Sequence, residues 1–364
     1  MSSKLKNGGA GSDQYVIKMN EKRDCPFLTE DNWCSIQRNH GEEYLSETCV
    51  TYPRRTYSFI NFYERALTMT CPVVAAQVLV LPDPLKFEYI EVPEIIHSNR
   101  HRIQSPFSPV PIELWPYIIK IQSAAIAILQ ERSLSIDHRL IVLGFFLDRL
   151  DEMIDNNTLE EINKLTEIYG SPDFIKQYAP IFAQNVKFDA QEFLKIVLGT
   201  FEALYGNDSS FLSKDKHFID SVIETLELQV NENNQLSISA TAEKYLMLNN
   251  FRKVFVDKFA AVFENFLVNE FFMNQYPWRF KGTIRYNFGV FVTIYKMLEL
   301  ITMSITISNI KHEKQPPMDK ITLTADIILF VNNIDHNNSY VNKISEHLKG
   351  KEDTALLIQS LLPG

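Results

Sequence analysis

Apolar residues recur with a helical spacing over most of the chain from Ile112 onward. A Trp115-Pro116 pair precedes an apolar run over 117–129, and proline suits the first turn of a helix. Ser135 stands at an N-cap position before apolar residues at 140, 143, 146, 147 and 150, which is the spacing of one helix face. Similar patterns predict helices at about 157–168, 188–205, 215–230, 240–273, 284–307, 319–333 and 339–361. Period-two alternation is rare and clearest at 236–238, so we expect residues 112–364 to form an all-α body.

The part of the chain before residue 112 has a different pattern. Residues 1–20 are polar and contain several glycines, which predicts a disordered or truncated start. Residues 21–92 hold every cysteine among many aromatic and turn-forming residues, and they predict a cysteine-rich metal-binding unit. The proline-containing stretch 93–111 predicts a linker. The expected fold class is therefore mainly α, with a small N-terminal cysteine-rich irregular unit packed on a larger multi-helix body.

Charge and hydropathy narrow the function classes. The formal net charge of −9 argues against nucleic-acid binding, because phosphate contacts need clustered Lys and Arg. An acidic body favours a cationic substrate such as a lysine side chain, although solubility is the simpler explanation. The apolar stretch 286–307 contains Lys296 and Glu299, so it predicts a buried helix and no membrane insertion. No apolar signal segment is seen near Met1, and we expect a cytoplasmic protein with reduced thiols. The oligomeric state is not indicated.

Four cysteines, Cys25, Cys34, Cys49 and Cys71, lie within 47 residues, and none occurs in the 293 residues that follow. Four thiolates brought together suit zinc or an iron–sulfur cluster. The spacing C-x8-C-x14-C-x21-C contains neither the short cysteine pairs of structural zinc sites nor the C-x3-C-x2-C arrangement of radical enzymes. Spacing alone therefore leaves two interpretations open, metal ligation and four independent buried thiols.

Several short runs around the cysteines carry a family resemblance. They are CPFL at 25–28, WCSIQ at 33–37, GEEYLS at 41–46, CVTYPR at 49–54 and ERALTMTCP at 64–72. This segment resembles the flagellin lysine-N-methylase family, and weaker matches continue at 264–272 and 335–337. The cysteine-rich segment that family members carry further upstream has no counterpart before Cys25.

The resemblance implies a function and a set of cofactors. It implies a protein-lysine N-methyltransferase that moves methyl groups from S-adenosylmethionine to surface lysines of flagellin in the cytoplasm before export. It also implies a 4Fe–4S iron–sulfur cluster held by Cys25, Cys34, Cys49 and Cys71, with zinc as the alternative metal. A function of another class stays open, a non-catalytic interaction protein in which the four cysteines form a structural zinc or iron–sulfur staple.

Six further residues are predicted to bind substrate or cofactor: Tyr52, Arg54, Arg55, Asn265, Asn269 and Tyr286. Tyrosine rings suit methylated ammonium groups. Arg54 and Arg55 suit a carboxylate of the donor or of a partner, and the alternative is an ion pair with Glu42-Glu43. Asn265 and Asn269 lie one helical turn apart and are either buried and paired or line a pocket. No GxGxG turn marks a donor site, so we expect it between the cysteine-rich unit and the helical body, and the catalytic residues stay unassigned.

Overall fold

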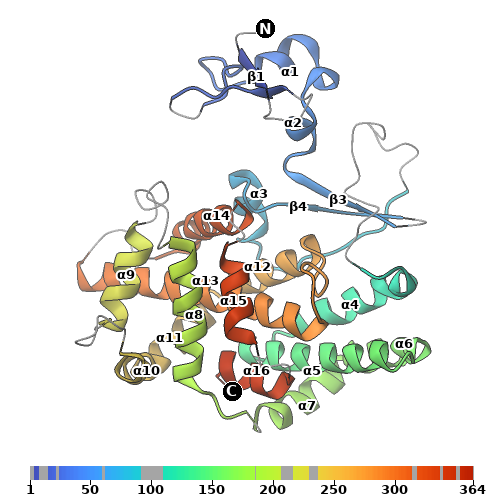
Figure 1. Ribbon diagram of the computed structural model, residues 1–364, viewed down its shortest axis with the longest axis vertical. Coiled ribbons are helices and arrows are strands. Elements are labelled where there is room, and N and C mark those ends of the chain that lie inside the picture. The colour runs from blue at the N-terminus through green and yellow to red at the C-terminus, as the bar shows by residue number, and fades with distance from the viewer. Residues whose placement is uncertain are drawn as a thin grey trace. The chain divides into compact units, whose positions relative to one another are not determined.

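The computed structural model describes residues 4–7, 15–21, 24–59, 62–91, 110–184, 186–205, 216–228, 237–313, 318–336, 339–349 and 353–363. Half of the predicted start, residues 93–109 of the predicted linker and Leu236 of the predicted alternation lie outside these ranges. The described chain forms two compact units, a smaller one that ends at Tyr52 and a larger one that begins at Pro53 (Figure 1). The predicted boundaries at 21, 92 and 111 stay predictions.

The smaller unit contains short elements joined by turns. Strands β1 (Leu5–Asn7) and β2 (Tyr15–Ile17) pair antiparallel, with Leu5 opposite Ile17. Helix α1 (Ser35–His40), the 3-10 turn η2 (Glu42–Tyr44) and helix α2 (Glu47–Thr51) follow. The Ser46 hydroxyl caps α2 by accepting a hydrogen bond from the Cys49 N–H.

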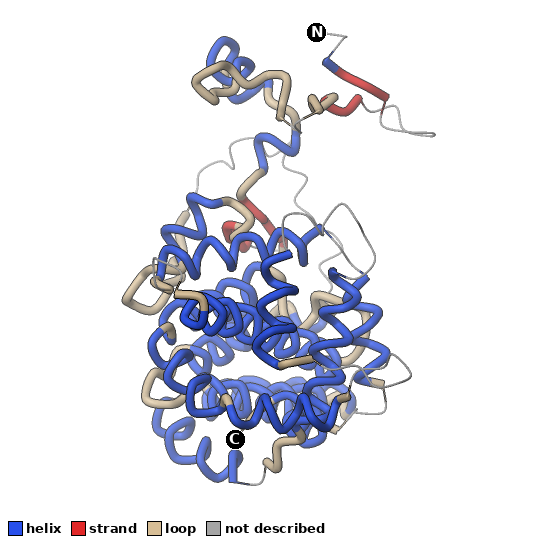
Figure 2. The backbone as a smooth tube through the Cα atoms, turned by 90° about the vertical axis from the view of Figure 1, so that its left-hand side faces the viewer, coloured by secondary structure: helices blue, strands red, loops and turns tan. Residues whose placement is uncertain are grey.

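The larger unit begins with a hairpin of β3 (Arg54–Ser58) and β4 (Tyr63–Leu67), in which Tyr57 lies opposite Glu64. Directly opposite residues in an antiparallel pair point to the same face, so these two side chains share one side of the hairpin. Strand β4 packs against α12 (Ala260–Met273), and α3 (Pro72–Val78) packs against α14 (Lys320–His336). Figure 2 shows the helices that make up most of this unit.

The other helices of the larger unit follow the hairpin in the chain. They are η3 (Ile112–Leu114), α4 (Ile118–Leu129), α5 (Ile136–Asp155), η4 (Leu159–Glu161), α6 (Ile162–Tyr169), α7 (Pro172–Gln184), α8 (Ala190–Tyr205), α9 (Lys216–Leu226), α10 (Ile238–Met247), α11 (Asn249–Lys258), α13 (Ile284–Lys311), α15 (Ser339–Leu348) and α16 (Thr354–Leu361). Ser135 caps α5 through the His138 N–H, as predicted.

Helix α13 lies at the centre of the core. Every residue from Asn287 to Thr306 is buried, and the helix packs against α5, α8, α9, α14, α15 and α16. Its length and composition would suit a membrane span, but 89% of its apolar window is buried inside the fold. The prediction of a buried helix at 286–307 is confirmed.

The mainly α fold class is confirmed, but several predicted helix boundaries are wrong. The helix predicted over 240–273 is three helices, α10, α11 and α12, with breaks at Leu248 and Phe259. Asn249-Asn250 follows the first break, and asparagine side chains compete with the helical backbone for hydrogen bonds. The helix predicted over 339–361 is α15 and α16, because Asp353 caps a new start. No pattern predicted α7, which contains Pro180.

Candidate functional site

The four cysteines divide between the two units. Cys25, Cys34 and Cys49 belong to the smaller unit and Cys71 to the larger one. Cys34 and Cys71 are the N-cap residues of α1 and α3, and neither side chain bonds to the helix N–H groups it precedes. Cys49 is exposed and the other three thiols are partly exposed, so the interpretation as four buried thiols is wrong.

The thiols can bind one metal ion only if they lie close together. Within the ranges that the structure describes, no three Cys, His, Asp or Glu side chains are grouped as ligands of one metal ion would be. Four-coordinate zinc and 4Fe–4S clusters need their ligands gathered at one centre. Cys25, Cys34 and Cys49, which share the smaller unit, are therefore not gathered as three ligands of one metal ion.

The two predicted asparagines on α12 have different surroundings. Asn265 is fully buried, and its side-chain nitrogen donates to the carbonyls of Val78, Leu79 and Leu81 at 3.0, 3.4 and 3.0 Å. It therefore satisfies carbonyls left open at the end of α3, which is a structural role. Asn269 donates only a long 3.3 Å hydrogen bond to the Leu67 carbonyl, and its side-chain oxygen is buried without a partner.

A buried group of charged and phenolic side chains lies where α12 ends. We call it the Arg279 cluster, and its members come from β3, α12, the following turn, α14 and α15: Arg55, Tyr57, Glu270, Asn274, Tyr276, Arg279, Asp335 and Tyr340. Arg279 pairs with Glu270 and lies 3.4 Å from the Asp335 carboxylate. Arg55 donates to the side-chain oxygen of Asn274. Three parts of the chain that are distant in sequence thus meet in one interior site.

Several polar atoms of the Arg279 cluster have no partner among the described residues. They are the Asn274 side-chain nitrogen and the Tyr276 and Tyr340 hydroxyls, all of them buried. Burial raises the pKa of Glu270, although the Arg279 charge opposes that shift. Burial also raises the pKa of both tyrosines, so their hydroxyls stay protonated. Unpaired buried polar groups are costly and usually mark a bound water or ligand.

A second group adjoins the first through consecutive residues of the chain. Gln275 follows Asn274 in a left-handed conformation with φ of 55°, and its side-chain nitrogen donates to Glu64 Oε2 at 2.7 Å. The Gln122 side chain donates to the same oxygen at 3.1 Å. Burial raises the pKa of Glu64, because the two amide hydrogen bonds compensate only part of the lost hydration. We call Glu64, Gln122 and Gln275 the Glu64 cluster.

The remaining predicted residues occupy different positions. Tyr52 is exposed at the end of α2 in the smaller unit, and Arg54 is exposed at the start of β3. Arg55 belongs to the Arg279 cluster, where it donates to the side-chain oxygen of Asn274. Tyr286 lies in the first turn of α13, where burial raises its pKa and its hydroxyl meets Ser345. Tyr286 is close enough to Tyr340 for the two phenols to interact electrostatically.

A charge network deeper in the core has a structural role. Arg252 of α11 pairs with Asp137 and, at 2.6 Å, with Glu299, while Lys296 pairs with Glu299 at 3.0 Å and also with Asp137. Two cations and two anions balance, so these groups fix how α5, α11 and α13 pack.

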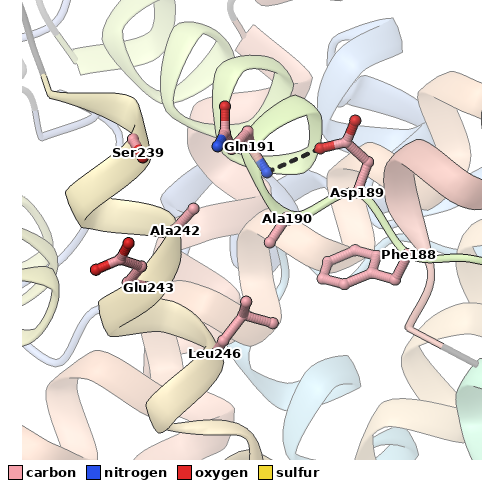
Figure 3. Close-up of a pocket in the computed structure, with 8 residues that line it drawn as sticks. All are labelled: Phe188, Asp189, Ala190, Gln191, Ser239, Ala242, Glu243 and Leu246. Carbon is pink, nitrogen blue, oxygen red and sulfur yellow. Dashed lines mark hydrogen bonds between the residues drawn. The ribbon is translucent and has the colours of Figure 1, made fainter.

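A surface groove of about 550 Å³ lies between the start of α8 and α10 (Figure 3). Phe188, Ala242 and Leu246 form its apolar lining, and the acidic residue Glu243 also lines it. The Asp189 carboxylate is occupied in capping α8 through the Gln191 and Glu192 N–H groups. None of the residues predicted from the sequence lines this groove.

Sequence reasoning missed most members of the two clusters. Glu270 stands inside the apolar helix α12, and a charged residue in such a helix signals a buried pair. Glu64 and Asp335 lie in stretches that carried the family resemblance, at 64–72 and 335–337. Tyr340 had no sequence signal beyond its place on an apolar helix face.

Comparisons with known proteins agree with the resemblance. Residues 122–359 match the FliB lysine N-methylase C-terminal domain. The lysine-N-methylases of Salmonella typhimurium strain LT2 and Salmonella choleraesuis are each 30% identical over 89 residues, 24% of this chain and 20% of theirs. The flagellar biosynthetic protein FliU of Salmonella muenchen is 36% identical over 62 residues, 17% of this chain and 37% of that protein. The match thus spans about a fifth of the two methylases. No solved structure matches.

Proposed function

The chain belongs to the family of the FliB lysine N-methylase C-terminal domain, and on that premise we propose that it methylates lysine side chains of flagellin. The observation that carries the proposal is the family match over 122–359, which includes most members of the Arg279 cluster. S-adenosylmethionine is the proposed methyl donor. The proposed location is the cytoplasm, where flagellin would be modified before its export.

The chemistry sets a clear demand on the site. A lysine must lose its proton before its nitrogen can attack the donor methyl, and at pH 7 that costs about 4.6 kcal/mol for an unperturbed amine. The N–C bond then forms as the S–C bond breaks, and S-adenosylhomocysteine leaves. A buried, weakly hydrated pocket lowers the pKa of the amine and so reduces the cost of deprotonation. The interior position of the Arg279 cluster supports it as that pocket.

The donor offers groups that suit residues of the Arg279 cluster. Its amino-acid end carries a carboxylate, and a guanidinium binds a carboxylate through two parallel hydrogen bonds. Arg55 donates to the neutral amide of Asn274 and bonds to the Tyr57 phenol, and its charge also acts to lower the pKa of Glu270. Among the described residues no carboxylate forms an ion pair with it. We therefore assign Arg55 to the donor carboxylate. The unpaired hydroxyls of Tyr276 and Tyr340 are assigned to the substrate amine.

The iron–sulfur cluster plays no part in this proposal. The three thiols of the smaller unit are not gathered as ligands of one metal centre, and the displacement proposed above needs no metal.

A direct assay tests the proposed function. The full chain is incubated with flagellin and isotope-labelled S-adenosylmethionine, and mass spectrometry follows one-methylene increments on lysines. The control is flagellin in which the modified lysines are replaced by arginine. The proposal requires labelled increments that disappear with the control flagellin. Folded protein that leaves flagellin unlabelled would refute it.

A further inference from the structure

Glu64 differs from the other buried carboxylates of the larger unit. Its side chain is 7% exposed, and its partners are the neutral amides of Gln122 and Gln275. Four of the five other buried carboxylates in the described ranges pair with Arg or Lys: Asp151 with Arg285, Glu264 with Arg132 and Arg139, Glu270 with Arg279, and Glu299 with Arg252 and Lys296. The fifth, Asp326, lies 3.8 Å from a ring nitrogen of His217. A buried carboxylate with only amide partners is therefore the exception, and a cation would complete it.

Two acceptor atoms at this position are unused. Both amide donors bind Glu64 Oε2, and Oε1 accepts no hydrogen bond from the part of the chain that the structure describes. Gln275 Oε1 is buried without a partner, while the nitrogen of the same amide is fixed by its bond to Glu64. Two unused oxygens from residues linked by a hydrogen bond form a receptor for a donor with several N–H groups. A primary ammonium is such a donor, and its charge would balance that of Glu64.

Phe87 and Tyr89 follow α3 in the chain, and Phe87 reaches the Glu64 cluster through Phe272, whose carbonyl accepts a 3.4 Å hydrogen bond from Gln275. Tyr89 is 77% exposed, yet it is close enough to Glu64 for the carboxylate to raise the pKa of the phenol, after the larger effect of partial burial. Two residues earlier, Phe87 packs against Phe272 at the end of α12, with ring centroids 4.6 Å apart. Rings beside a carboxylate suit the aliphatic stem and the charged or methylated head of a lysine.

We propose that Glu64, Gln275 and Tyr89 form a receptor for the ammonium group of a substrate lysine. This inference rests on the proposed function and deepens it by naming the residues that select the side chain. Glu64 and Gln275 accept hydrogen bonds from the ammonium, and Tyr89 contacts it from the solvent side. The Glu64 cluster adjoins the Arg279 cluster through Asn274, Gln275 and Tyr276. The receptor therefore binds the lysine in its charged form, before the amine moves to the neighbouring Tyr276 and Tyr340 hydroxyls and loses its proton.

Binding can be measured apart from catalysis. The full chain is titrated with Nα-acetyl-lysine amide in a calorimeter, with Nα-acetyl-norleucine amide as the uncharged probe. Glu64→Gln keeps the shape of the side chain and removes its charge, and we expect it to weaken lysine-amide binding about tenfold or more while leaving the norleucine probe unchanged. Tyr89→Leu, at an exposed position, should weaken it about threefold. Glu88→Gln is the matched control, because it removes an exposed charge beside Tyr89.

The outcomes separate this inference from the proposed function. If the wild-type chain methylates flagellin and Glu64→Gln binds lysine amide equally well, the receptor is refuted and the methylase stands. If lysine amide binds through Glu64 but flagellin is never labelled, the receptor stands and the methylase is refuted. If Glu64→Gln does not fold, Tyr89→Leu decides alone, and unchanged binding by that variant overturns the proposal.

Discussion

The side-chain nitrogen of Asn265 donates a hydrogen bond to the backbone carbonyl of Val78 at 3.0 Å. The same nitrogen reaches the carbonyls of Leu79 and Leu81, so one side chain of α12 closes the end of α3. These carbonyls would otherwise be left without partners in the interior.

Replacing Asn265 by alanine should therefore be costly. We expect Asn265→Ala to lower the free energy of unfolding by about 2–3 kcal/mol, because it leaves buried carbonyls unsatisfied. Asn269→Ala is the control on the same helix face, and it should cost less than about 1 kcal/mol because it loses one long hydrogen bond. Urea unfolding followed by circular dichroism measures both. Equal losses for the two variants would contradict the structural role of Asn265.

The sequence predicted helices and their caps more accurately than it predicted which side chains contact one another. The cap at Ser135 and the burial of α13 follow from local spacing and from charges inside an apolar run. Of the two alternatives for Asn265, the structure shows the buried and paired one, while its predicted role in binding substrate or cofactor stays a prediction. Local patterns carry this information because helix periodicity and capping involve residues within a few positions of one another.

The site could not be read from the sequence in the same way. Arg55 and Asn274 are 219 residues apart, and Glu64 and Gln275 are 211 apart, yet each pair shares a hydrogen bond. Such partners are set by how β3 and β4 pack against the end of α12, which no local pattern encodes. A charge such as Glu270 inside an apolar helix signals that a buried partner exists, but it does not show which residue that partner is.

The charge network around Asp137 predicts a pH dependence of stability. Burial acts to raise the pKa of Asp137, but Arg252 and Lys296 outweigh it and lower the pKa to about 2. The native state therefore holds this proton more weakly than the unfolded chain. The resulting stability, about 2 kcal/mol, is present above pH 4 and is lost as the pH falls from about 4 to about 2. We expect the stability gap between wild type and Asp137→Asn to narrow over that range. The exposed control Glu346→Gln should show no such change, and a gap independent of pH would reject the assignment.

The raised pKa of Glu64 predicts a pH dependence of stability whose sign is opposite to that of Asp137. Burial raises its pKa, so the native state binds the proton more tightly than the unfolded chain does. Ionised Glu64 therefore destabilises the fold at neutral pH, and the penalty disappears as the pH falls below its native pKa. We expect Glu64→Gln to be more stable than wild type at pH 7, with the difference vanishing in acid. Chemical unfolding at a series of pH values measures this, and a Glu64→Gln variant that is less stable at pH 7 would show that the carboxylate has a cationic partner.

Replacing Arg55 should selectively weaken the binding of the methyl donor. If its guanidinium binds the donor carboxylate, Arg55→Met should raise the KM for S-adenosylmethionine about ten- to a hundredfold, which corresponds to losing one charge-assisted hydrogen-bonded contact. The KM for flagellin should change little. Arg65→Met is the control, because Arg65 lies on the same hairpin and bonds to the exposed Thr56 hydroxyl. Initial rates at varied donor concentration measure both, and a similar donor KM for the two variants would remove Arg55 from the site.

Replacing Cys71 should change the free energy of unfolding in a direction that depends on whether its thiol binds a metal. It is the N-cap residue of α3, its thiol makes no capping bond, and Pro72 already occupies the first helical turn. Serine is a strong N-cap residue, so without a metal Cys71→Ser should raise the free energy of unfolding by up to about 1 kcal/mol. The variant should behave the same before and after dialysis against a chelator. Thermal unfolding of wild type and variant, with and without the chelator, makes the measurement, and Cys49→Ser serves as an exposed control. If both substitutions and the chelator lower the unfolding temperature together, the two thiols share a metal, and the expectation for a metal-free Cys71 is rejected.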